Sequence, residues 1–62
     1  MSARDAAYLE ALARAHLLAP EDSVEEDWAG LAFAHAADRL GSDVDALLDC
    51  ESERLREEGL LS

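Results

Sequence analysis

The single proline and two of the three glycines divide the chain into three segments of helical pattern. Pro20 ends the first segment, because the residue before a proline resists the α conformation. Gly41 and Gly59 follow the second and third segments, where a residue in the left-handed conformation commonly ends a helix. The chain has only two β-branched residues, both valines, so no segment has the pattern of a strand. These signals predict an all-α fold.

Serine caps predict where the first two helices begin. Ser2, with Asp5 three residues later, resembles a capping box, and we expect a helix over about residues 3–18. Ser23, with Glu26 at N3, fits the capping box more closely and predicts a second helix over residues 24–40.

A third helix is predicted over about residues 43–58. Ser42 is its candidate N-cap, with Asp45 at N3. Gly59 stands in the C′ position, and we expect Leu60 to pack back onto the helix. The arginines near the end of this helix lie at helical spacings from its glutamates, where each ion pair stabilises a helix by about 0.2–0.5 kcal/mol.

Apolar residues at helical spacings predict the faces that pack together. The second helix is apolar nearly all round, and a helix of that kind is usually buried. We therefore expect it to be the central helix, with Trp28 as a core anchor and Gly30 permitting close approach of another helix. The predicted inward-facing residues are Tyr8, Leu9, Leu12, Ala15 and His16; Val24, Trp28, Leu31 and His35 on one face of the second helix, extended by Phe33, Ala36, Ala37 and Leu40; and Val44, Leu47, Leu48 and Leu55.

Sixty-two residues make one small domain, residues 1–62, which we expect to be a compact three-helix bundle. A chain of this length buries only about 60% of the surface that it exposes when unfolded. Half of the residues are apolar, but much of that half is alanine, which adds little core volume. The core should therefore be thin, and a self-associating surface, as in a homodimer, would help to stabilise it.

The net charge of −10, from fifteen acidic residues against five arginines, constrains the partners. Like charges repel, so nucleic acid and anionic lipid are disfavoured as direct partners, and a basic protein surface is the complementary expectation. No apolar run is long enough to span a membrane, and the acidic residues near the N-terminus argue against a targeting peptide. The single Cys50 fits a reducing, cytoplasmic setting or an intermolecular disulfide.

Two acidic clusters flank the start of the second and third predicted helices. Acidic residues at a helix N-terminus stabilise it by about 0.3–1 kcal/mol each, and a high net charge favours solubility. Helix capping and solubility are therefore one explanation of the clusters, and a surface that binds a basic partner is the other. No lysine or arginine lies between Arg14 and Arg39. The candidate partner-binding residues are Glu21, Asp22, Glu25, Glu26, Asp27, Asp43, Asp45 and Asp49.

No motif for catalysis or for a cofactor is present, and we expect a protein that is not an enzyme and that binds no cofactor. His16, His35 and Cys50 lie on three different predicted helices, and neither their spacing nor any CxxC or HxxxH pair indicates a metal site. The histidines are equally explained as interfacial packing residues. A Cys50–His dyad would need the fold to bring the pair together by chance. The chain has no phosphate-binding loop and no nucleophile elbow.

With its clusters Glu21, Asp22, Glu25, Glu26, Asp27 and Asp43, Asp45, Asp49, the chain resembles small acidic anti-CRISPR proteins of phages and mobile elements, in particular those that mimic DNA. The resemblance is one of size, charge and helical content over the whole chain. It implies a stoichiometric, non-enzymatic inhibitor, acting in the bacterial cytoplasm, whose acidic face occupies the nucleic-acid-binding surface of a CRISPR effector complex and blocks target DNA.

The alternative function is that of a small helical interaction module or subunit, similar to an antitoxin, that binds through apolar surface. Trp28, Phe33, Leu60 and Leu61 favour this alternative, because together they exceed what one thin core can bury. Such a protein would form a stable complex with a second copy or with another chain.

Overall fold

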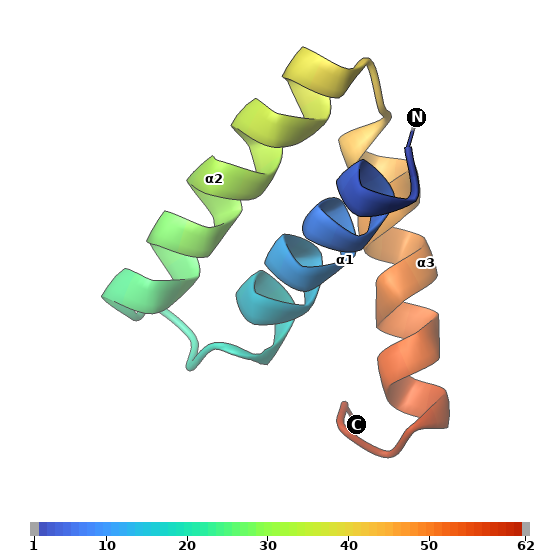
Figure 1. Ribbon diagram of the computed structural model, residues 1–62. Helices are drawn as coiled ribbons and strands as arrows, with labels where there is room; N and C mark the ends of the chain where they lie inside the picture. The colour runs from blue at the N-terminus through green and yellow to red at the C-terminus, as the bar shows by residue number, and fades with distance from the viewer. Residues whose placement is uncertain (1, 62) are drawn as a thin grey trace.

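The computed structural model describes residues 2–61, and in them it has three α-helices and no strand. They are α1 (Ala3–Leu18), α2 (Val24–Leu40) and α3 (Val44–Glu57), joined by short turns (Figure 1). The Cα radius of gyration is 11.2 Å. The prediction of an all-α three-helix bundle is confirmed, with helix bounds within a residue of those expected.

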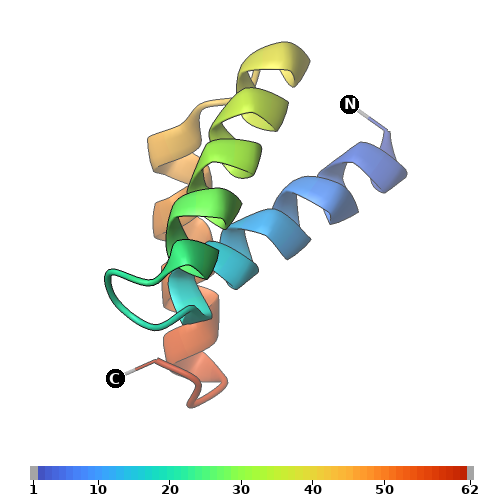
Figure 2. The ribbon, with the colours of Figure 1, turned by 90° about the vertical axis from the view of Figure 1, so that its left-hand side faces the viewer.

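The central helix is α1, and the expectation that the second helix would be central was wrong. α1 packs against both other helices, whereas α2 and α3 meet mainly near the turn that joins them. Turned by 90°, the molecule presents α2 in front of the rest of the chain (Figure 2). One long side of α2 is therefore left facing solvent.

The caps of α1 and α2 follow the sequence prediction in part. The Ser2 hydroxyl accepts the N–H of Asp5 at 3.1 Å, and the Ser23 hydroxyl accepts the N–H of Glu26 at 3.1 Å. The Ser23 N–H donates to the Pro20 carbonyl at 3.2 Å, which closes the turn before α2. That N–H is satisfied without the Glu26 carboxylate, so only one half of the predicted capping box forms.

The N-cap of α3 is Asp43, not Ser42 as the sequence suggested. The Asp43 carboxylate accepts the N–H groups of Asp45 and Ala46, at 3.0 and 3.3 Å. Ser42 belongs to the end of α2, because its N–H donates to the Ala37 carbonyl at 2.8 Å after Gly41 turns the chain at φ 72°. One serine cannot complete the end of α2 and also begin α3, so the next residue takes the second role.

The end of α3 has the predicted glycine turn without the predicted packing. Gly59 has φ 80°, and the N–H of Leu60 donates to the Leu55 carbonyl at 2.9 Å. The Leu60 side chain is nevertheless 54% exposed. The backbone bond that ends the helix therefore forms without the apolar contact that we expected beside it.

The buried core lies where α1 meets α2 and extends toward α3. Phe33, the largest side chain in it, is 1% exposed and packs among small residues. Gly30 on α2 lies against α1, since a Cβ built there would be 2.9 Å from His16 Nδ1. The close approach predicted for Gly30 is confirmed. The main core cluster comprises Leu9, Ala13, Phe33, Ala36 and Ala37, with Leu12, Leu40, Val44, Leu47 and Leu48 packed partly buried against them. Leu55 of α3 is also fully buried, as predicted.

Candidate protein-binding surface

Helix α2 carries two apolar faces on opposite sides. Successive residues of an α-helix are rotated by about 100°, so Phe33 lies about 180° around α2 from Val24. Phe33, Ala36 and Ala37 face the core and are buried. The opposite face carries four residues that we call the outer stripe: Val24, Trp28, Leu31 and His35.

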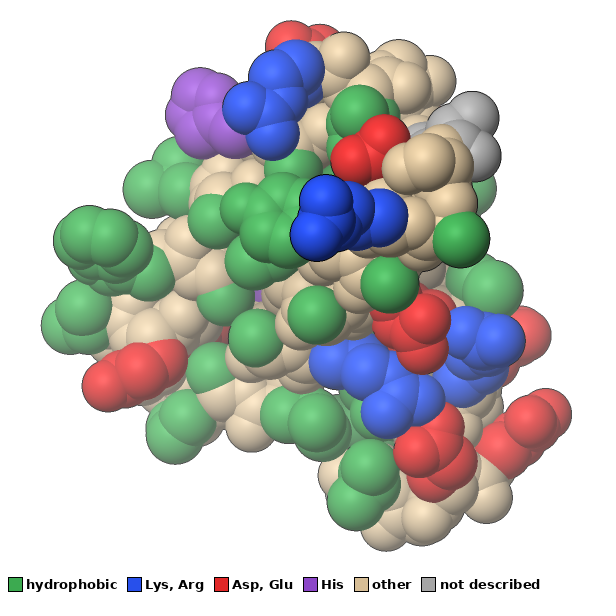
Figure 3. All heavy atoms as spheres, viewed as in Figure 1, with side chains coloured by type: hydrophobic (Ala, Val, Ile, Leu, Met, Phe, Trp, Pro, Cys, Tyr) green, Lys and Arg blue, Asp and Glu red, His purple; other side chains and the backbone are tan. Residues whose placement is uncertain are grey.

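All four residues of the outer stripe are exposed. Trp28 is 73% exposed, Val24 69% and Leu31 63%, and His35 is also exposed. A shallow depression lined by Trp28, Leu31, Ala32 and His35 lies along it. Figure 3 shows hydrophobic side chains protruding on the left, on the side of α2 turned away from the other helices. Exposed apolar surface of this kind is typical of a protein interaction site.

The sequence predicted that these residues share a face, and they do, but it placed that face in the core. Trp28 in particular was expected to be a core anchor, and this was wrong. The inner face of α2 already fills the space against α1 with Phe33 and alanines. Because α3 packs on α1 instead of covering α2, nothing among residues 2–61 covers the outer stripe.

Five of the eight predicted acidic residues lie together at the start of α2, in a group that we call the α2 acidic end. It comprises Glu21, Asp22, Glu25, Glu26 and Asp27. Glu21 and Asp22 are in the turn before the helix, with Asp22 at φ 60°. All but Glu26 are exposed. Glu26 is tied down through its backbone, because its N–H is bound by Ser23 and its carbonyl lies 3.0 Å from His16 Nδ1.

The other three predicted residues lie at the far end of α2 and are not brought together with the first five. The 17 residues of α2 rise about 1.5 Å each, which separates the two ends by roughly 25 Å. Asp43 caps α3, so its carboxylate has a structural role. Asp45 and Asp49 are exposed on α3, one turn apart. The monomer therefore presents two acidic regions and not one acidic face.

The acidic residues between α1 and α3 are paired with arginines, in a network that we call the seam. It comprises Glu10, Arg14, Glu51, Arg54 and Glu58. Glu51 is the one buried charged residue of the described chain, at 6% exposed. Its carboxylate accepts from Arg14 Nε and from Arg54 Nη1, both at 3.1 Å. Arg14 also pairs with Glu58, and Arg54 Nη1 lies 3.4 Å from Glu10 Oε1. Of the ion pairs predicted within the third helix, Arg54–Glu51 forms, whereas Arg56 takes part in no ion pair among residues 2–61. No local pattern indicated the bonds between helices.

The bonds of the seam raise the pKa of both of its arginines. Hydrogen bonds to Glu58, and then to Glu51, raise the pKa of Arg14 above its already high usual value. A hydrogen bond to Glu51 is also the main reason that the pKa of Arg54 is raised. A cation whose pKa rises on folding contributes stability at every pH below its unfolded pKa. Titration of these arginines therefore does not weaken the seam near neutral pH.

Arg14 and Arg54 supply the cation in every ion pair among residues 2–61, and Glu10, Glu51 and Glu58 supply the carboxylates. None of the eight predicted binding residues takes part. Figure 3 shows arginine and acidic side chains gathered at the lower right, away from α2. The α2 acidic end therefore keeps its charge uncompensated within the described chain.

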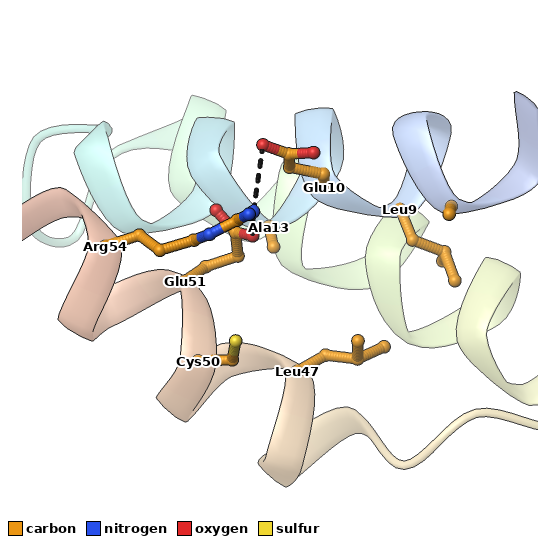
Figure 4. A pocket seen from close by; sticks show the side chains of 8 residues that line it. Leu9, Glu10, Ala13, Leu47, Cys50, Glu51 and Arg54 are labelled. Carbon is orange, nitrogen blue, oxygen red and sulfur yellow. Dashed lines mark hydrogen bonds and ion pairs between the residues drawn. The ribbon is translucent and has the colours of Figure 1, made fainter. Parts of the chain in front are cut away.

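A groove runs along the seam and includes the cysteine. It is lined by Leu9, Ala13 and Leu47 on its apolar side and by Glu10, Glu51 and Arg54 on its polar side. Figure 4 shows the Arg54 side chain extending from α3 toward Glu10, with Cys50 on α3 at the edge of the groove. Cys50 is a free, exposed thiol. The polar groups of the groove bind one another, so the groove is part of the interface between α1 and α3.

The fold distributes the two histidines and the cysteine over three different surfaces. His16 lies between α1 and α2 against Gly30, His35 is on the outer stripe, and Cys50 is at the seam groove. Across residues 2–61, no group of three or more His, Cys, Asp or Glu side chains is placed to hold a metal ion. The convergence that a His–His–Cys cluster or a Cys–His dyad would need does not occur.

Comparison of the chain with family models, curated proteins and solved structures finds no match. Helices α1, α2 and α3 are each too short or too polar to cross a membrane. The outer stripe and the α2 acidic end are adjacent exposed surfaces of one helix.

Proposed function

We propose that this protein is a non-enzymatic inhibitor that binds a basic, nucleic-acid-binding surface of another protein through the α2 acidic end. Following the resemblance to acidic anti-CRISPR proteins, the expected partner is a CRISPR effector complex in the bacterial cytoplasm, and the expected consequence is that target DNA no longer binds. The protein would bind stoichiometrically and bring no cofactor to the complex.

The uncompensated charge of the α2 acidic end carries the proposal. Glu21, Asp22, Glu25 and Asp27 are exposed, and they take no part in the ion pairs formed by Arg14 and Arg54. Capping accounts for part of this cluster, but Ser23 alone provides the cap that forms. A surface that binds phosphate with lysine and arginine would also attract this cluster, since the attraction depends on charge.

The experiment measures binding of the protein to a purified CRISPR effector complex over a range of salt concentrations, and then competition with target DNA. The test variant is Glu25→Lys with Asp27→Lys. The control is Glu53→Lys with Glu57→Lys, two exposed residues of α3 that change the net charge by the same amount. We expect the affinity of the unmodified protein to fall as the salt concentration rises. At one salt concentration, the test variant should bind at least tenfold more weakly than the control variant.

Two results would contradict binding through the α2 acidic end. One is binding that is flat with salt and indifferent to the test variant. The other is equal weakening by test and control variants, because that would show a response to net charge alone and not to the α2 acidic end. Binding that leaves target DNA in place would retain the interaction and eliminate the inhibitory function.

A second candidate function is that of a small helical interaction module, similar to an antitoxin, and the exposed outer stripe favours it. The three apolar residues of the stripe, Val24, Trp28 and Leu31, are each more than 60% exposed. Trp28 is the only tryptophan of the chain, so its fluorescence reports on this face alone. A blue shift of Trp28 emission on titration with the effector complex would indicate apolar contact; unchanged emission on binding would exclude the stripe from that interface.

A further inference from the structure

We infer that the outer stripe of α2 is a contact surface for a second copy of this chain, with the two α2 helices packed antiparallel about a two-fold axis. The proposed dimer takes up the apolar stripe of the second candidate function and does not depend on any CRISPR partner. In the dimer, the second copy covers the outer stripe, which the three helices of one copy leave exposed.

The spacing of the stripe is self-complementary. Val24, Trp28, Leu31 and His35 follow one another at intervals of 4, 3 and 4 residues. This is the spacing of a coiled-coil seam, and it reads the same in both directions along the helix. An antiparallel second copy therefore places its Leu31 opposite Trp28 and its Val24 opposite His35. A two-fold interface requires a patch that matches itself in this way.

The charges at the two ends of α2 set the direction of pairing. The α2 acidic end lies at the N-terminus, whereas Arg39, the one arginine of α2, lies near the C-terminus and is exposed. Antiparallel packing keeps the two acidic ends apart and places the exposed pair Asp38 and Arg39, whose charges cancel, beside the acidic end of the other copy. Parallel packing would place the two acidic ends together, which costs repulsion along the first turns.

The area of the stripe predicts a weak dimer. A stable interface buries about 800 Å² on each partner, and one aromatic side chain supplies only about 150–250 Å². Trp28 with two aliphatic residues and His35 falls short of the stable class. Each copy also carries a net charge of −10, and this long-range repulsion opposes association. A dissociation constant between about 10 μM and 1 mM is expected.

Sedimentation equilibrium over that range of concentration tests the dimer. We expect a monomer–dimer equilibrium that Trp28→Ala weakens at least tenfold and that Leu31→Ala weakens less. Both residues are exposed, so both variants should fold, as far-UV circular dichroism will verify. The matched control is Tyr8→Ala, which removes a half-exposed aromatic residue from α1 and should leave the association unchanged.

Salt separates the dimer from the binding to a basic partner. Screening weakens repulsion between two acidic copies and also weakens attraction to a basic surface, so added salt should strengthen the dimer and weaken the other complex. A chain that remains monomeric to about 1 mM at high salt would overturn the dimer and leave the stripe to another protein. A dimer that survives Trp28→Ala unchanged would overturn it equally, whatever the result with the effector complex.

Discussion

The two faces of α2 are both apolar, and the fold treats them in opposite ways. Phe33 on the inner face is 1% exposed, and Trp28 on the outer face is 73% exposed. The inner face meets α1 through small residues, among them Ala13, Ala36 and Ala37. The outer face has no element of the described chain in front of it. The same helix therefore supplies the largest buried side chain, Phe33, and the largest exposed aromatic side chain, Trp28.

This difference separates the apolar surface that the domain uses for folding from the apolar surface that folding does not use. A helix that is apolar all round is normally surrounded, and α2 is covered on one side only. The acidic residues divide in the same way, because Glu51 at the seam is buried between two arginines while the α2 acidic end is left unpaired. Both uncommitted features lie on α2, one long side of which faces solvent, and a partner has access there.

The largest expected effect is on the inner face. Phe33→Ala should destabilise the fold by about 3–5 kcal/mol. At about 0.05–0.15 kcal/mol per residue, a domain of this size has only about 3–9 kcal/mol to lose, so the variant should lose half or more of its stability. Far-UV circular dichroism and urea unfolding measure the loss. Leu31→Ala, two residues away on the outer face, is the control, and equal destabilisation by both variants would remove the distinction between the faces.

The second effect is on the seam. Glu51→Ala removes the carboxylate that joins Arg14 and Arg54 and should destabilise the fold by about 1–3 kcal/mol, because its hydrogen bonds are charge-assisted and part-buried. Glu53→Ala, an exposed neighbour, should change the stability by less than about 0.5 kcal/mol. Urea unfolding of the two variants compares them. If Glu51→Ala were as stable as the control, the seam would be an incidental surface contact.

The sequence was sufficient for the helices because their ends depend on local bonds. Pro20, Ser23, Gly41 and Gly59 all act where they were predicted to act. The one misplaced cap, at Ser42, arose where two helix ends compete for neighbouring residues. Local signals of this kind require no knowledge of the rest of the fold.

What the sequence could not predict depends on which helix packs where. An apolar pattern identifies both faces of α2 and does not say which of them is covered, so Trp28 was placed in the core. The bond from Arg14 to Glu51 joins residues 37 positions apart, and no spacing rule reaches that far. The eight acidic residues were expected to act together, but α2 separates them, because the second cluster begins where that helix ends.

A smaller effect on stability is expected at Gly30, where α2 lies against α1. An alanine there would gain about 1 kcal/mol of helix propensity, but its Cβ would lie 2.9 Å from His16 Nδ1. The ring would have to move and lose its contact with the Glu26 carbonyl, so Gly30→Ala should give no net gain or a small loss in thermal stability. In a His16→Ala background the same change should stabilise. Stabilisation in both backgrounds would show that α1 and α2 pack less closely there.

The smallest effect on folding should come from the largest exposed side chain. Trp28→Ala removes few internal contacts, and alanine favours the helix, so the free energy of unfolding of the dilute monomer should change by less than about 0.5 kcal/mol. Urea unfolding should be followed by circular dichroism, since the variant lacks the fluorophore, at a protein concentration well below that of self-association. A loss comparable to that of Phe33→Ala would mean that the chain itself covers the outer stripe. At low protein concentration, the variant and the unmodified protein should be equally stable. At high concentration, the variant should be the less stable of the two, which would show that Trp28 contributes to association and not to the fold.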